Sequence, residues 1–223
     1  MSNQHKIRRL FFLILLVGIS SLMGCAIGVT RVRIDHDPLI RVENKKEGNI
    51  LVSEFKDVRP VREYIGNKRN AYGMVLGHIG TESGVSLTEI LTKYFAEALN
   101  QAGYTVAIMK ETKVPEGSEK IKFDAMLEGE IREFWLDLYM AVWHYVTVRL
   151  IAERPESKEV LWEKVVNGEE KRVLWVGATA EYERIIRESL TKALNQAVSE
   201  FASDEFRQAI RSSKPPSYKD FRK

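Results

Sequence analysis

Apolar and polar residues alternate along the middle of the chain. Phe123, Leu127 and Ile131 alternate with charged residues, and residues 140–153 continue with a row formed by every second residue, Met140, Val142, His144, Val146, Val148 and Leu150. A period of two is typical of strands, whose side chains point alternately to the two faces of a sheet. The pattern predicts two long strands, with the mainly aliphatic row of the second facing the core.

Further strands are predicted on both sides of this stretch. Residues 49–55 and 104–109 are compact apolar runs, and residues 160–166 and 171–176 flank Asn167-Gly168. Asn-Gly is typical of a two-residue hairpin turn, so we expect the last two runs to form a hairpin. Residues 64–84 are rich in glycine and predict either a long flexible loop or a loosely paired hairpin.

Two segments repeat apolar residues at steps of three and four, which is typical of helices. The first begins after Ser86, which makes an S-x-x-E capping box with Glu89, and ends before Gly103, where a left-handed C-cap is expected. The second begins near Ala178 and runs past Phe201, and residues 204–211 predict one further helical turn.

These elements predict an α+β fold, with an antiparallel-rich sheet and two main helices packed on one of its faces. Each helix carries one apolar stripe, which a single sheet face can bury. We assign residues 49–211 to one domain and residues 212–223, which hold Pro215-Pro216 and several basic residues, to a disordered tail.

The N-terminus has the composition of a signal peptide. Lys6, Arg8 and Arg9 precede the apolar residues 10–19, which are too few to span a bilayer. The sequence Leu22-Met23-Gly24-Cys25 follows, and it resembles the lipobox of bacterial lipoproteins. That resemblance implies diacylglycerol on Cys25 and cleavage just before it, so that residues 1–24 are a lipoprotein signal peptide. Two alternatives are an ordinary signal with an incidental cysteine and an uncleaved anchor helix.

Lipidation of Cys25 would anchor the protein to a membrane without crossing it. Each buried methylene contributes about 0.8 kcal/mol, so several acyl chains hold a protein lastingly. Residues 25–48 then form the lipidated N-terminus and a spacer, and a short strand is possible within it. Cys25 is the only cysteine, so no disulfide can form within the chain.

The net charge of +3 comes from the signal peptide. The chain has 34 basic and 31 acidic residues, and the three basic residues before Cys25 leave 31 of each in the mature part. A neutral domain lacks the basic surface that nucleic-acid binding needs, so we expect no nucleic-acid partner.

The chain resembles the YajG-like family of small bacterial lipoproteins. The resemblance rests on the lipobox at Cys25, on residues 52–60 followed by residues 65–70, on Gly103-Tyr104 at the end of the first helix, and on a final helix that closes with Asp204-Glu205-Phe206. It covers nearly all of the mature chain. It implies an envelope lipoprotein without assigned catalytic residues, and Ala26 in place of aspartate after the lipidated cysteine implies delivery to the outer membrane, facing the periplasm.

No catalytic, cofactor or metal site is predicted. The histidines of the mature part, His36, His78 and His144, lack metal-ligand spacing, and His144 falls on the core row. The glycines of residues 77–84 lack the Gly-Lys-Ser/Thr ending of a phosphate loop, so we interpret them as a flexible connection. Glu128 and Glu130 share one strand face and form either a carboxylate pair or an exposed acidic face.

An aromatic cluster is the candidate partner surface. Trp143 and Tyr145 lie on the row opposite the aliphatic one, and Trp135 and Tyr139 precede them. Exposed aromatic clusters often mark interfaces, although cross-strand rings can also brace a sheet, or the N-terminal leader can cover them. We therefore expect a non-catalytic domain that binds a protein or another envelope partner. The alternatives are an accessory lipoprotein of an envelope transport system and, less favoured, an enzyme.

Overall fold

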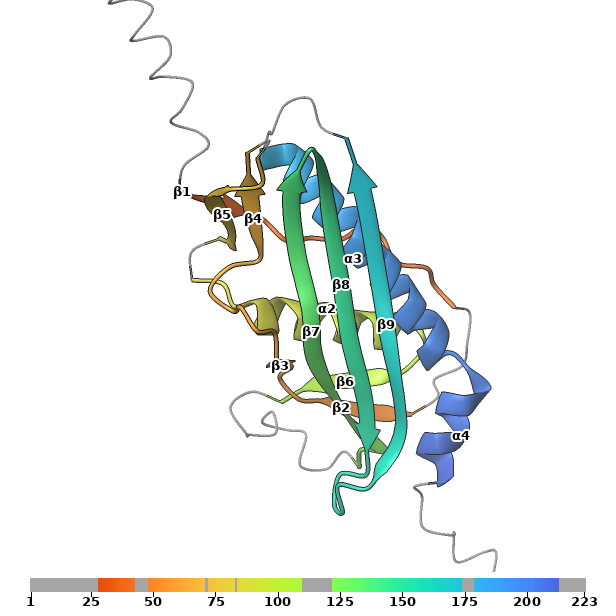
Figure 1. Ribbon diagram of the computed structural model, residues 1–223. Coiled ribbons are helices and arrows are strands. Elements are labelled where there is room, and N and C mark those ends of the chain that lie inside the picture. Colours follow the sequence, from red (N-terminus) through yellow and green to blue (C-terminus); the bar gives the residue numbers. More distant parts are fainter. Residues whose placement is uncertain are drawn as a thin grey trace, which may run out of the picture.

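The computed structural model describes residues 28–42, 48–70, 72–82, 84–109, 122–173 and 179–212 (Figure 1). The elements in chain order are β1 (Gly28–Val32), β2 (Asn49–Val52), β3 (Lys56–Asp57), β4 (Gly66–Arg69), β5 (Val75–Thr81), α2 (Leu87–Gln101), β6 (Thr105–Ile108), β7 (Ala125–Tyr139), β8 (Ala141–Glu153), β9 (Val160–Arg172), α3 (Thr179–Phe201) and α4 (Asp204–Ser212). The predicted signal peptide, residues 1–24, lies outside the described residues, as do Cys25 and residues 213–223.

The strands form one mixed sheet organised around β7. Along one edge of β7 the short strands β2, β3 and β4 pair with it in parallel, and along the other edge β8 pairs with it in antiparallel register. β9 pairs with β8, while β5 and β1 extend the sheet beyond β4 and β6 extends it beyond β2. The α+β class is confirmed, and the longest strand pairs are antiparallel, but the short strands make the sheet mixed.

Both long helices cover the same face of this sheet (Figure 1). α3 packs along β8 and β9 and also touches α2, and the core lies between the helices and the sheet. On the strand side the core takes the buried residues of the predicted row, among them Val142, Val146, Val148 and Leu150. Met140 is an exception to the predicted row, because it forms the turn between β7 and β8 with a φ of 57°.

A β-bulge keeps β7 amphipathic over its full length. The register with β8 shifts between Ile131 and Glu133, so one extra residue, Arg132, is accommodated there. Ile131 and Phe134 are therefore both buried although they are three residues apart. Without the bulge, one end of β7 would turn its apolar residues to solvent.

The predicted hairpin at Asn167-Gly168 is wrong. β9 runs without interruption through both residues and pairs with β8 along its length. A Cβ atom on Gly168 would fall on the backbone carbonyl oxygen of Ser189 in α3. This glycine therefore allows close approach of a helix rather than a turn.

His144 lies in the core, as its position on the strand predicts. Its Nδ1 lies 2.5 Å from the Ser189 hydroxyl oxygen, and that hydroxyl lies within 3.0 Å of the carbonyl oxygens of Ile185 and Ile186. The Ser189 hydroxyl donates its proton to these carbonyl oxygens, so toward His144 it can only accept. Nδ1 of the neutral imidazole therefore carries the hydrogen and donates it to Ser189. Burial lowers the pKa of His144 from 6.5 to about 3.

Residues 28–42, which the sequence predicts to be part of a spacer, pack against the domain. β1 pairs in parallel with β5, and Val32 and Ile34 are buried. The following residues run along α3, where Asp37 N–H donates to the Thr191 hydroxyl and Asp35 bonds Arg187 at 2.7 Å. This leader therefore fastens the N-terminal side of the chain to the last long helix.

The glycine-rich stretch forms the hairpin that was one of its two predicted structures. β4 and β5 pair in antiparallel register, and Gly77 and Gly80 lie within β5. Both predicted helices are confirmed, and Gly103 has a φ of 98° at the end of α2. At its start Ser86 accepts a hydrogen bond from Thr88 N–H instead of the Glu89 N–H that the capping box predicts. Among the described residues, no helix combines the length and the apolar character that a membrane crossing requires.

The contact at Gly168 predicts a specific loss of stability. Gly168→Ala should lower the free energy of unfolding by about 1–3 kcal/mol, because the new methyl group forces α3 away from β9. Glu169→Ala, at the exposed neighbouring position, is the matched control and should change it little. Urea unfolding monitored by circular dichroism measures both. Equal effects of the two substitutions would contradict the close contact.

The buried histidine predicts a pH dependence. The unfolded chain takes up a proton on residue 144 below about pH 6.5, whereas the folded protein does not until about pH 3. Protonation of this residue therefore leaves the free energy of unfolding unchanged above pH 6.5. Below pH 6.5 it should lower that free energy by up to about 1.4 kcal/mol for each pH unit. The His144→Gln variant lacks this titrating group, so its free energy of unfolding does not fall with pH for this reason. The difference in unfolding free energy between wild type and the variant should therefore shrink between pH 7 and pH 4.5 in urea titrations. A deficit that does not change with pH would count against the buried neutral imidazole.

Candidate functional site

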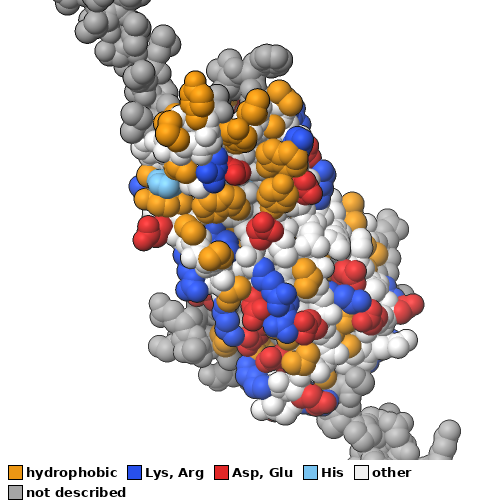
Figure 2. Space-filling model, in the orientation of Figure 1, with side chains coloured by type: hydrophobic (Ala, Val, Ile, Leu, Met, Phe, Trp, Pro, Cys, Tyr) orange, Lys and Arg blue, Asp and Glu red, His pale blue; other side chains and the backbone are white. Residues whose placement is uncertain are grey.

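The face of β7, β8 and β9 that points away from the helices is divided into two halves. We call it the outer face; Figure 2 shows hydrophobic side chains gathered toward its upper end and charged side chains below. The outward residues of β8 show the same division. Trp143 and Tyr145 lie near the start of the strand, and Arg149 lies farther along it.

Trp135, Tyr139, Trp143 and Tyr145 form the aromatic half of the outer face. Strand pairing sets Trp135 opposite Tyr145, and Trp143 stacks on Tyr145 with ring centroids 6.3 Å apart. Lys171 of β9 places its ammonium 3.8 Å from the centre of the Trp143 ring. Tyr139 is exposed and the other three side chains are partly exposed, so the structure brings the predicted residues together on a solvent-facing surface.

Ion pairs fill the other half of the outer face. Arg149 bonds both carboxylate oxygens of Glu163, at 2.6 and 2.8 Å, and also Glu130. These hydrogen bonds raise the pKa of Arg149, and the bond from Arg149 lowers the pKa of Glu163. Glu128 accepts from Lys56 at 2.7 Å, and this bond raises the pKa of Lys56. Glu128 and Glu130 are therefore held by separate cations, and this is an ion-paired charged face.

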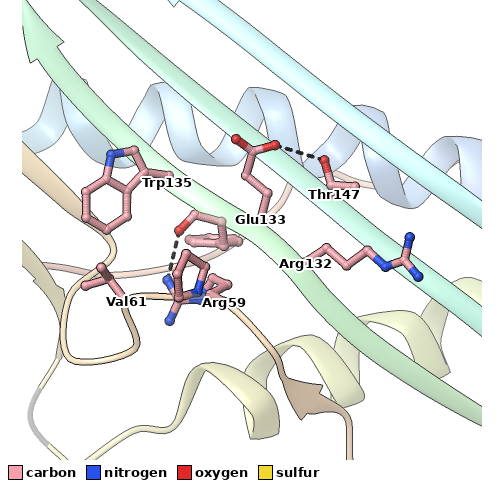
Figure 3. A pocket seen from close by; sticks show the side chains of 8 residues that line it. Arg59, Val61, Arg132, Glu133, Trp135 and Thr147 are labelled. Atoms are coloured by element: carbon pink, nitrogen blue, oxygen red, sulfur yellow. Dashed lines mark hydrogen bonds between the residues drawn. The ribbon is translucent and has the colours of Figure 1, made fainter.

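A pocket of about 350 Å³ lies beside the aromatic half (Figure 3). Its walls come from the segment after β3, through Arg59, Pro60 and Val61, and from β7 and β8, through residues 132–135 and Thr147. Trp135 belongs to both the pocket and the aromatic half, so the two form a continuous surface.

Polar residues that line the pocket form hydrogen bonds with other residues of the domain. Arg59, whose side chain is buried, donates to both carboxylate oxygens of Asp57 and to the carbonyl oxygens of Tyr64 and Phe134. Glu133 accepts a hydrogen bond from Thr147. No sequence pattern predicted this pocket, and its only signal in the sequence is the charged residue Arg59 beside Pro60.

The three described histidines lie apart in separate environments. His36 pairs with Glu97 at 3.3 Å, His78 stacks on Tyr64 with centroids 4.0 Å apart, and His144 is buried. No group of three or more metal-ligating side chains occurs within the described part of the chain. The flexible connection predicted for residues 77–84 is wrong in its first part, because residues 77–81 belong to β5 and pair with β1 and β4. Cys25 and the preceding Leu22, Met23 and Gly24 lie outside the described residues.

Comparisons with solved structures show a similar fold in one protein, which alone of the following three has a TM-score above 0.5. Protein XCC0632 from Xanthomonas campestris, a DUF330 protein, has a similar structure with a TM-score of 0.59. The two sequences are 14% identical, and the match covers 83% of this chain and 99% of that one. A neuraminyllactose-binding hemagglutinin homolog from Helicobacter pylori has a TM-score of 0.48 at 13% identity, covering 79% and 98% of the two chains. Lipoprotein GNA1162 from Neisseria meningitidis has a TM-score of 0.38 at 14% identity, covering 68% and 99%. No protein-family model and no curated protein matches the sequence. The similarity to XCC0632 therefore concerns the architecture of the domain.

Proposed function

We propose that this chain is a non-catalytic lipoprotein of the bacterial envelope, anchored by lipid on Cys25, whose domain binds a protein or another envelope partner through the aromatic half of the outer face. The observation that carries the binding function is that Trp135, Tyr139, Trp143 and Tyr145 lie together on the sheet face that the helices leave uncovered. Its membrane is the outer membrane and its domain faces the periplasm.

The anchor rests on the order of features in the N-terminal sequence. A basic start, a short apolar run, the small residue Gly24 and Cys25 follow one another as in a lipobox. Ala26 after the cysteine supports outer-membrane delivery, and the resemblance to YajG-like lipoproteins supports the same location.

The uncovered aromatic half supports a binding role. Tyr and Trp are enriched at the centres of protein interfaces, because they bury a large area with little loss of side-chain freedom. The leader does not cover these rings, because it pairs with β5 and then runs along α3. The adjoining pocket offers a recess for a partner side chain beside Trp135.

The chemistry of the outer face supports a non-catalytic role. Arg59, Glu130 and Glu163 are each bonded to partners within the domain. A general acid or base needs a titratable group near the reacting atoms with a pKa suited to the task. On this surface the charged groups instead neutralise one another.

The anchor is tested by replacing the lipidated residue. Cys25→Ser should move most of the protein out of the membrane fraction, either as soluble protein or as unprocessed precursor, because the serine hydroxyl does not replace the thiol in lipid transfer. Fractionation with immunoblotting measures this. Ala26→Ser, one residue later, is the matched control and should leave the protein with the membranes. Mature Cys25→Ser protein that still sediments with membranes would contradict lipidation.

The partner surface is tested by truncating its rings. Trp143→Ala combined with Tyr145→Ala should reduce recovery of a crosslinked partner from intact cells by about tenfold or more, because truncation of central aromatic residues costs on the order of 2 kcal/mol. Val165→Ala, an exposed position on the charged half of the same sheet face, is the matched control. Thermal unfolding establishes that both variants are folded. Unchanged partner recovery with the folded double variant would contradict a partner site on the aromatic half.

A further inference from the structure

Six strand ends meet at one end of the sheet. The register sets Arg69 of β4 opposite Val75 of β5, and β4 runs parallel to β7 as far as Leu138. The turn at Met140 then leads into β8, and β9 ends opposite Val142. β1 also begins here, with Gly28 paired to Gly77. Two hairpin ends, the start of β1 and the end of β9 therefore lie at the same end of the domain (Figure 1).

This end carries the most exposed large hydrophobic residues of the described chain. Tyr72 is 88% exposed, Met140 77%, Val173 61% and Met74 59%. We call these four residues, together with the exposed Tyr139, the apolar tip. The next most exposed of these side chains, Val160 at 55%, lies at the opposite end, where β9 begins. Monomeric soluble proteins rarely gather apolar side chains in this way without a function for them.

The backbone holds the two hairpin ends of the tip in fixed turns. The Asn70 side chain accepts from the backbone N–H groups of Tyr72 and Met74, and Asn70 N–H donates to the Met74 carbonyl oxygen. Met140 makes a tight turn with positive φ between Tyr139 and Ala141, which face each other across β7 and β8. The apolar side chains are thus presented outward.

The lipidated cysteine is close to this end in sequence. Only three residue steps separate Cys25 from Gly28, where β1 begins. An extended chain spans at most about 3.6 Å per residue, so these steps reach roughly 11 Å. A lipid on Cys25 would therefore hold the beginning of β1, and with it the apolar tip, close to the membrane surface.

We propose that the apolar tip docks on the bilayer that holds the lipid of Cys25, so that the domain stands end-on with β7, β8 and β9 directed away from the membrane. This inference rests on the proposed lipidation. Tyrosine suits the boundary between lipid and water. Met74 and Met140 at the hairpin ends and Val173 after β9 enter the apolar layer. The bilayer contact also explains why four strongly exposed hydrophobic residues gather where the tether begins.

The end-on position leaves Tyr145 and Trp135 of the aromatic half in water, whereas Tyr139 belongs to the tip. Strands rise about 3.4 Å per residue, so Trp143 lies roughly 10 Å and Tyr145 roughly 17 Å along β8 from Met140. Trp143 is thus near the headgroups, whereas Tyr145 and Trp135 stand clear of them. The ion-paired half is farther still, so its network stays out of the lipid, while the Arg69–Asp137 pair of 2.9 Å lies near the tip.

The test uses the mature lipidated protein in vesicles of phosphatidylethanolamine and phosphatidylglycerol. In wild type the thiol of Cys25 is consumed by the lipid, so a cysteine introduced by Met140→Cys or Tyr72→Cys is the only site for a thiol-reactive fluorophore. Val160→Cys, exposed at the opposite end, is the matched control. Quenching is measured with nitroxide-labelled lipids and, separately, with iodide in the water.

Both tip labels should be quenched several-fold more by the nitroxide lipids than the label at position 160, and less by iodide. Equal quenching at both ends would overturn the proposal, because it would mean that the domain moves freely on its tether. A tip label shielded from both quenchers would also overturn it, because a protein or a second copy of this chain would then cover the tip. Failure of lipidation is recognised separately, since wild-type protein would then take up the fluorophore on Cys25 and would not float with the vesicles.

Discussion

The close contact of α3 with β8 and β9 determines which surface of this protein is available. Gly168 removes the side chain that would strike the backbone of α3, and Ser189 of the same helix turn bonds the buried His144. The helix therefore covers the aliphatic row of β8 completely, and α2 lies on the same face. The alternate row, with Trp143 and Tyr145, is left on the outer face because no helix of the described residues packs there.

The second constraint is the length of β7. It is long enough to pair in succession with β2, β3 and β4 on one edge, and its bulge at Arg132 keeps its buried residues on the helix side throughout. Because β4 pairs at the end of β7, the β4–β5 hairpin and the β7–β8 turn reach the same end of the domain. β1 pairs with β5 and so begins there too. The topology thus brings the tether and the apolar tip together.

Local patterns predicted much of this structure, whereas long-range contacts decided the rest. Period-two alternation identified β7 and β8 and placed Trp143 and Tyr145 away from the core, and helical spacing identified α2 and α3. Trp135 and Tyr139 join them because of the bulge at Arg132, which the alternation does not reveal. Asn167-Gly168 has the composition of a turn, but a helix distant in sequence uses the glycine for packing. The parallel pairing of the short strands, the docking of the leader and the burial of Arg59 likewise depend on partners that no local pattern reveals.

The most direct test of the account is the chemical state of the mature N-terminus. Intact-mass and N-terminal peptide mass spectrometry of the protein extracted from bacterial membranes measure it. The account predicts that the mature chain begins at Cys25 and carries a thioether-linked diacylglycerol on the sulfur. A mature chain that begins at another residue, or one with an unmodified Cys25, would contradict the lipid anchor and with it the end-on position of the domain.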